Sequence, residues 1–143
     1  MPRVSLWFFA VAPVYVLIGM SLGIFMGVSG NHSLYPAHAH MNLIGWVTMA
    51  LFGTFYALAR DASKKLAWTA FWLTNAGLVI MIPSLAMVLT YGEQPQYVLP
   101  LGISEFLMLA GMACFALSVW GVLRKSLRDD SRGTAIARPL AAE

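Results

Sequence analysis

The sequence predicts an all-α integral membrane protein: a four-helix up-down bundle with both termini in the cytoplasm. Of its 143 residues, 59% are hydrophobic and only 10% are charged, whereas about a quarter of a soluble domain is charged. Four apolar segments each exceed the roughly 20 residues that cross a bilayer. They are residues 4–28, 37–59, 66–91 and 98–123. The connections between them are short, so neighbouring helices should be antiparallel.

The ends of the chain are interpreted from their composition. The N-terminus has one arginine followed by an apolar run, but the run continues to about Val28 without a small-residue cleavage site. We therefore expect a retained span rather than a signal peptide. Residues 1–124 should form the transmembrane domain. Residues 125–143 are polar, with mixed charge and no apolar period, and are expected to be a disordered cytoplasmic tail.

The basic residues predict the orientation. Lys and Arg occur before the first span, in the loop of residues 60–65 and from residue 124 onward, whereas residues 29–36 and 92–97 contain none. By the positive-inside rule these two loops face outward, in a cytoplasmic membrane of the bacterial type. The net charge of +3 lies beside the spans and forms no basic stripe, so we expect a lipid bilayer and no nucleic acid as partner.

The segment "PAHAHMNLIGW" carries two histidines, His38 and His40, at the start of the second span. An imidazole inside a span is costly and is a functional candidate by default, although an interfacial capping role is the alternative. Residues i and i+2 of an α-helix lie about 200° apart. The pair therefore suits two centres on opposite sides of the helix better than one shared metal ion, since a zinc pair on a helix needs i,i+4 spacing.

Haem is the expected centre. A neutral imidazole supplies an axial ligand to the iron, and the macrocycle packs among apolar side chains. The first span repeats Gly19, Gly23 and Gly27 on one face. These glycines suit either room for the ring or close helix packing, and both interpretations stay open.

Copper is the alternative metal, because imidazole and thioether groups suit it. The candidate ligands near the outer surface are His32, His38, His40 and Met41.

Two other polar residues lie inside spans. Glu105 is the only acidic residue well inside one. It is expected to orient a ligating imidazole, to transfer protons, or to be a neutral acid bonded to another helix. Asn75 is expected to form a hydrogen bond between helices.

The stretch "HMNLIGWVTMALFGTFYAL" from His40 resembles the second helix of subunit I of the haem-copper oxidases, especially the nitric oxide reductase and cbb-type branch. "FWLTNAGLVIMI" from Phe71 is similar to that family's third helix. The resemblance covers residues 4–123 but is specific only around His38–Tyr56. It implies haem b, with His40 as an axial ligand and Asn42 beside it. The pair His38 and His40 also resembles the family's tenth helix, whose two histidines serve two haems.

The sequence departs from this family in ways that matter for function. Subunit I has twelve spans in three arcs of four, and the histidines and tyrosine of its copper centre have no counterpart here. The resemblance therefore implies electron transfer or binding of a diatomic gas rather than a complete oxidase, and it leaves the redox partner unknown. A homotrimer would rebuild twelve helices, with a haem between His38 of one chain and His40 of the next. A homodimer is the simpler arrangement, and a cofactor-free accessory protein is the remaining alternative.

Overall fold

The computed structural model describes residues 1–137, with side chains described to residue 131, and within this range the chain is all-α. The second long helix is continuous from Tyr35 to Leu58 and consists of three segments. The elements are α1 (Arg3–Ser29), α2 (Tyr35–His40), η1 (Met41–Thr48), α3 (Met49–Leu58), α4 (Lys64–Tyr91) and α5 (Pro95–Ala137). In this part of the chain, the four long helices are each long and apolar enough to cross a membrane.

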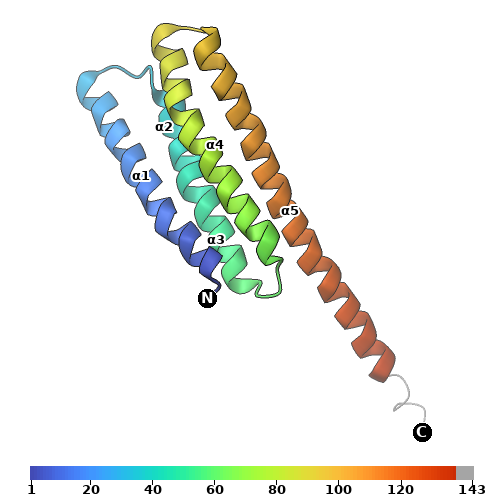
Figure 1. Cartoon of the computed structure of the whole chain (residues 1–143). Helices are drawn as coiled ribbons and strands as arrows, with labels where there is room; N and C mark the ends of the chain where they lie inside the picture. The colour runs from blue at the N-terminus through green and yellow to red at the C-terminus, as the bar shows by residue number, and fades with distance from the viewer. Residues whose placement is uncertain (138–143) are drawn as a thin grey trace.

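The helices run up and down, as Figure 1 shows. Helices α1 and α4 begin at one end of the bundle, and α2 and α5 begin at the other. We call the first the basic end, because Arg3, Lys64 and Lys65 lie there, and the second the histidine end, because His32 and His38 lie there. The four apolar segments predicted from the sequence each form one of these helices.

Local sequence sets the ends of the helices. Gly30, with φ of 67°, terminates α1 in the left-handed conformation that glycine adopts most readily. Pro36 occupies the first turn of α2, where the missing N–H costs no hydrogen bond. The Ser63 hydroxyl caps α4 by accepting from the Leu66 N–H at 3.4 Å.

The second long helix contains a π-helical segment, η1, that begins directly after His40. The Thr48 hydroxyl donates to the carbonyl of Leu43, five residues earlier, at 3.0 Å. Because π turns close between residues i and i+5, this segment is wound more widely than the α-helical segments on either side of it. Such segments often occur at functional sites.

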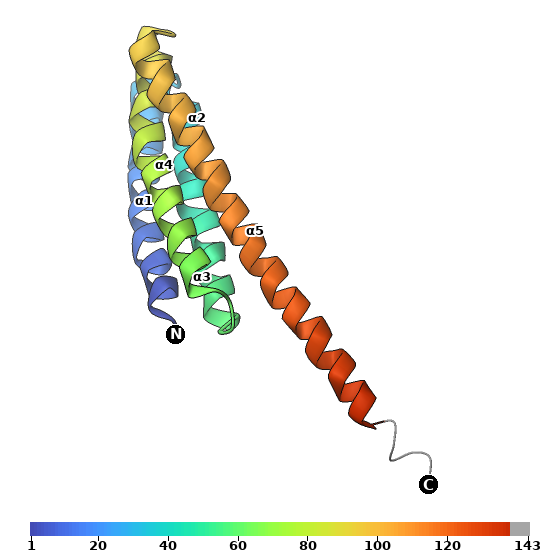
Figure 2. The ribbon, with the colours of Figure 1, turned by 45° about the vertical axis from the view of Figure 1, so that its right-hand side comes forward.

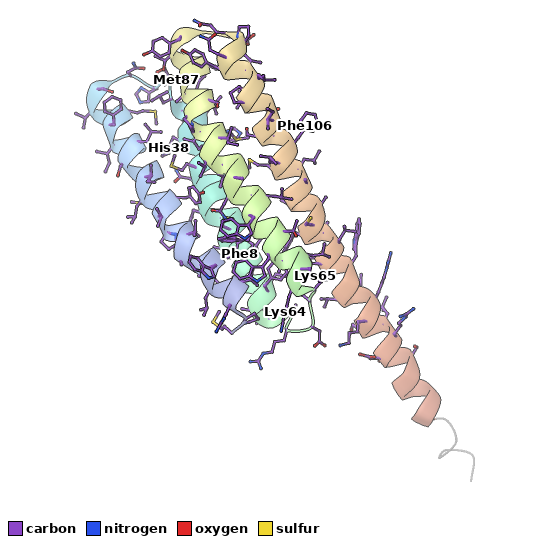
Figure 3. All side chains as sticks on the ribbon, in the orientation of Figure 1. Phe8, His38, Lys64, Lys65, Met87 and Phe106 are labelled. Atoms are coloured by element: carbon purple, nitrogen blue, oxygen red, sulfur yellow. The ribbon has the colours of Figure 1, made fainter. Side chains whose placement is uncertain are left out.

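An aromatic core lies toward the basic end. The Phe8 ring is fully buried and meets Phe71 edge to face, with centroids 5.1 Å apart. Phe52 of α3 stacks on Phe115 of α5 with centroids 3.9 Å apart. Figure 3 shows Phe8 within this layer. The stack joins α3 to α5 and fixes the relative height of these two helices.

The C-terminal part differs from expectation. We expected disorder from residue 125, but α5 continues to Ala137, and Figure 2 shows it extending beyond the other helices. Its lysine, leucine, arginine and alanine residues favour a helix, and no proline occurs before residue 139. In addition, the Lys125 ammonium forms an ion pair with Asp61 at 2.7 Å. Residues 138–143 lie outside the described range.

Candidate functional site

His38 faces α1, as Figure 3 shows. Its Nδ1 lies 2.8 Å from the carbonyl oxygen of Gly19, and its Nε2 lies 3.1 Å from the amide nitrogen of Asn42. A proton on Nδ1 then donates to Gly19. The amide nitrogen of Asn42 also lies 3.4 Å from Nδ1, so it lies beside the ring and not in line with the Nε2 lone pair. His38 is thus held against α1 through Nδ1, and the Asn42 amide contacts the same ring.

The glycines of α1 explain how His38 fits. A Cβ at Gly23 would lie 2.8 Å from Cε1 of His38, and one at Gly19 would collide with Oδ1 of Asn42. Gly27 has open space around its Cβ position. Of the two interpretations of these glycines, close packing therefore accounts for Gly19 and Gly23 as they stand. Oδ1 of Asn42 is buried and has no hydrogen-bond partner among the described residues.

His40 differs from His38 in its hydrogen bonding. Its Nδ1 lies 2.7 Å from the carbonyl oxygen of Pro36, one turn earlier. A carbonyl only accepts, so Nδ1 carries the proton and Nε2 keeps its lone pair. The described residues give Nε2 no hydrogen-bond partner. A histidine whose Nδ1–H is held by a backbone carbonyl is oriented as a metal-ligating histidine usually is.

An apolar groove of about 310 Å³ lies between the second helix, α4 and α5. It is lined by Ile44, Thr48, Phe52, Thr74, Met108, Leu109 and Met112. His40 precedes Ile44 by four residues, about one helical turn, so it lies nearer to the histidine end than the groove-lining residues of the same helix.

Glu105 is placed at the same end of this groove. It is exposed, and it precedes the groove-lining Leu109 by one helical turn. The stacked pair Phe52 and Phe115 gives a common reference level. His40 precedes Phe52 by about 18 Å and Glu105 precedes Phe115 by about 15 Å, if each helix rises as an α-helix does. The wide π turns shorten the distance between His40 and Phe52. His40 and Glu105 thus have similar depth. No hydrogen bond or ion pair joins them in the described chain, so the role of Glu105 as a partner of the imidazole stays a prediction.

The residues of the copper alternative do not come together. His32 is exposed in the first loop, with Nδ1 3.1 Å from the carbonyl oxygen of Gly30. Met41 is buried on the core side of the helix. Among the described His, Cys, Asp and Glu residues, no group of three is placed to hold a metal ion.

Asn75 forms the predicted contact between helices, because its Oδ1 accepts from the Tyr15 hydroxyl at 3.0 Å. The groove and the π-helical segment were not predicted from the sequence. Thr48 and Met108 look like ordinary span residues, and only the packing of three helices reveals that they line a shared surface.

No family model, no curated protein and no solved structure matches this chain. The function must therefore be argued from the site itself.

Proposed function

We propose that this chain is a small membrane b-type cytochrome in which Nε2 of His40 binds the haem iron. The observation that carries the proposal is the 2.7 Å contact between Nδ1 of His40 and the carbonyl of Pro36. It fixes the tautomer that leaves Nε2 able to ligate, and it does so at the end of an apolar groove. The resemblance of the following residues to haem-copper oxidases supports the same assignment.

The groove suits the apolar part of a haem. Its walls are aliphatic, aromatic and thioether side chains, with the hydroxyls of Thr48 and Thr74 as its polar groups. Haem bound there would supply one-electron transfer if both axial positions are filled, and binding of a diatomic gas if one is open. His40 orients the iron, and the groove keeps water away from it.

The second axial ligand, where there is one, comes from another copy. Within one chain His38 is held by Gly19 and Asn42, and His32 lies in a loop. In a trimeric site that joins His38 to His40 of the next chain, Nε2 of His38 would ligate, so His38 would keep its bond to Gly19 but the Asn42 amide would have to move away from the ring. Pairing His40 with His40 of a second copy requires no such movement, so the contacts favour the homodimer over the homotrimer.

The placement in the membrane is part of the proposal. The basic end is cytoplasmic and the histidine end faces outward, because Lys and Arg are retained on the cytoplasmic side. The haem then lies in the outer half of a bacterial-type inner membrane.

Absorption spectra of the purified protein test this function. Wild type expressed with adequate haem should show a Soret band that shifts on reduction with dithionite, and His40→Ala should lose it. His32→Ala is the matched control and should keep it. A colourless wild type would refute the proposal, and copper found in place of iron by metal analysis would favour the alternative centre.

A further inference from the structure

The basic end of the seam between α1 and α4 carries positive charge without an anionic partner. Arg3 begins α1, and Lys64 and Lys65 begin α4. Figure 3 shows both lysines extending from this end of the bundle. None of the three forms an ion pair with a described residue, whereas the nearby Lys125 is paired with Asp61 at 2.7 Å.

Two tryptophans that follow these basic residues pack against the same aromatic ring, between α1 and α4. Trp7 lies one turn after Arg3, and Trp68 lies one turn after Lys64. Both rings pack edge-on against Phe71, with centroids at 6.4 and 5.7 Å. Tryptophan is the residue that most often marks the level of the lipid headgroups. The cations therefore lie one helical turn beyond this level, where phosphate groups are found.

The charges at the start of α4 also oppose the helix dipole. The N-terminus of a helix carries partial positive charge and favours acidic side chains. The first turns of α1 and α4 contain none, and α4 has two lysines there instead. An external anion would relieve this repulsion.

An apolar hollow lies directly beside Arg3. It measures about 350 Å³ and is lined by Arg3, Leu6, Trp7 and Ala10. Trp7 is 54% exposed, so its indole is available to a ligand. A cation at one end of an apolar surface hollow suits a molecule with an anionic head and a hydrocarbon chain.

We propose that this surface, formed by Arg3, Trp7, Lys64 and Lys65, binds an anionic phospholipid. The headgroup phosphate contacts the three cations, and an acyl chain lies in the hollow along α1. A free phosphate shares the head chemistry, but it leaves the hollow and the exposed indole unused. The site is independent of haem binding.

Native mass spectrometry of the detergent-purified protein tests the proposal, with phosphatidylglycerol and phosphatidylcholine added in parallel. Wild type should retain phosphatidylglycerol preferentially. Each lost cation should weaken binding about fivefold, so the double variant Lys64→Gln/Lys65→Gln should bind about 25-fold more weakly. The charge-preserving variant Lys64→Arg/Lys65→Arg should bind as wild type does.

The matched control is Arg124→Gln/Arg128→Gln, which removes the same charge from α5. It should leave phosphatidylglycerol binding nearly unchanged. An equal loss in both double variants would mean diffuse attraction and would overturn the site. Equal retention of phosphatidylcholine, or displacement of the lipid by excess inorganic phosphate, would also overturn it.

Discussion

The Tyr56 hydroxyl donates a hydrogen bond of 3.0 Å to Oγ of Ser118, which joins α3 to α5. Ser118 in turn donates to the carbonyl of Cys114 at 3.0 Å. Both side chains are buried, and the bond lies one turn beyond the stacked rings of Phe52 and Phe115. Together these contacts join α3 to α5 at the end of the groove nearer to the basic end. They fix the position of Glu105 along the bundle axis relative to that of His40.

Removing the Tyr56 hydroxyl and removing the Ser118 hydroxyl should lower the free energy of unfolding by different amounts. Tyr56→Phe loses one interhelical hydrogen bond, and Ser118 keeps its other partner, so we expect a loss of about 0.5–1 kcal/mol. Ser118→Ala leaves the buried tyrosine hydroxyl unpaired and should cost about 1–2 kcal/mol. Unfolding by dodecyl sulfate in mixed micelles measures both. A larger loss in Tyr56→Phe than in Ser118→Ala would contradict this ordering.

The glycines of α1 should differ sharply in their tolerance of a methyl group. Gly23→Ala places a Cβ 2.8 Å from Cε1 of His38, and the backbone of α1 fixes its position. The imidazole must then move, at a cost of about 1–3 kcal/mol. Gly27→Ala meets no atom within 4 Å and is the matched control. Thermal unfolding and the imidazole NMR signals of His38 report the difference. Equal stability of the two variants would show that His38 is not packed as described.

The ion pair between Asp61 and Lys125 predicts a pH effect at the basic end. The hydrogen bond and the charge of Lys125 lower the pKa of the Asp61 carboxyl below its ordinary value. For a carboxyl of lowered pKa, the stabilising contribution is complete above its pKa in the unfolded chain. It is lost as the pH falls through its pKa in the folded chain. Lys125→Gln should therefore return the Asp61 titration, followed by carboxyl NMR, to the ordinary range. An unchanged midpoint would mean that the pair does not persist in solution.

Topology can be checked independently of any cofactor. In a Cys114→Ser background, Ser33→Cys at the histidine end should react with an impermeant reagent applied to the outside of cells. Ser63→Cys at the basic end should not react until the membrane is opened. The loss of the Ser63 cap affects only the first turn of α4. The reverse labelling pattern would invert the proposed orientation.

The sequence predicts the helices well because each span needs only a long apolar run. The positions of Gly19 and Gly23 also indicate a close contact, since small residues on one face have few other uses in a span. The difference between His38 and His40 does not follow from sequence, because both rings contact a backbone carbonyl and only the Asn42 amide beside His38 distinguishes them. The 200° separation predicts that the two rings lie on different sides, and the contacts with Gly19 and Asn42 show that the ring of His38 is held against α1.

Two features lie beyond what patterns of residues predict. The π-helical segment has no signal of its own in "MNLIGWVT", because a single turn type depends on how neighbouring helices pack. The helical continuation of α5 was missed because polar composition alone indicates a disordered tail. Lys125 of this segment pairs with Asp61, more than sixty positions earlier, and the pattern of neighbouring residues does not predict such a contact.

The last prediction concerns the number of chains that share a haem. Of the two histidines in the second span, His40 alone has an Nε2 with no contact to another side chain among the described residues, and His32 lies in the loop before that span. Six-coordinate haem with two histidine ligands therefore requires a second copy. If His40 pairs with His40, native mass spectrometry should find one haem per two chains, and His38→Ala should still bind haem with a bis-histidine spectrum. If His38 of a neighbour is the partner instead, His38→Ala and His40→Ala should each lose that spectrum, and mixing the two variants should restore part of it. His32→Ala serves as the control in both cases. A monomer that carries haem with two histidine ligands would contradict sharing between chains in either form.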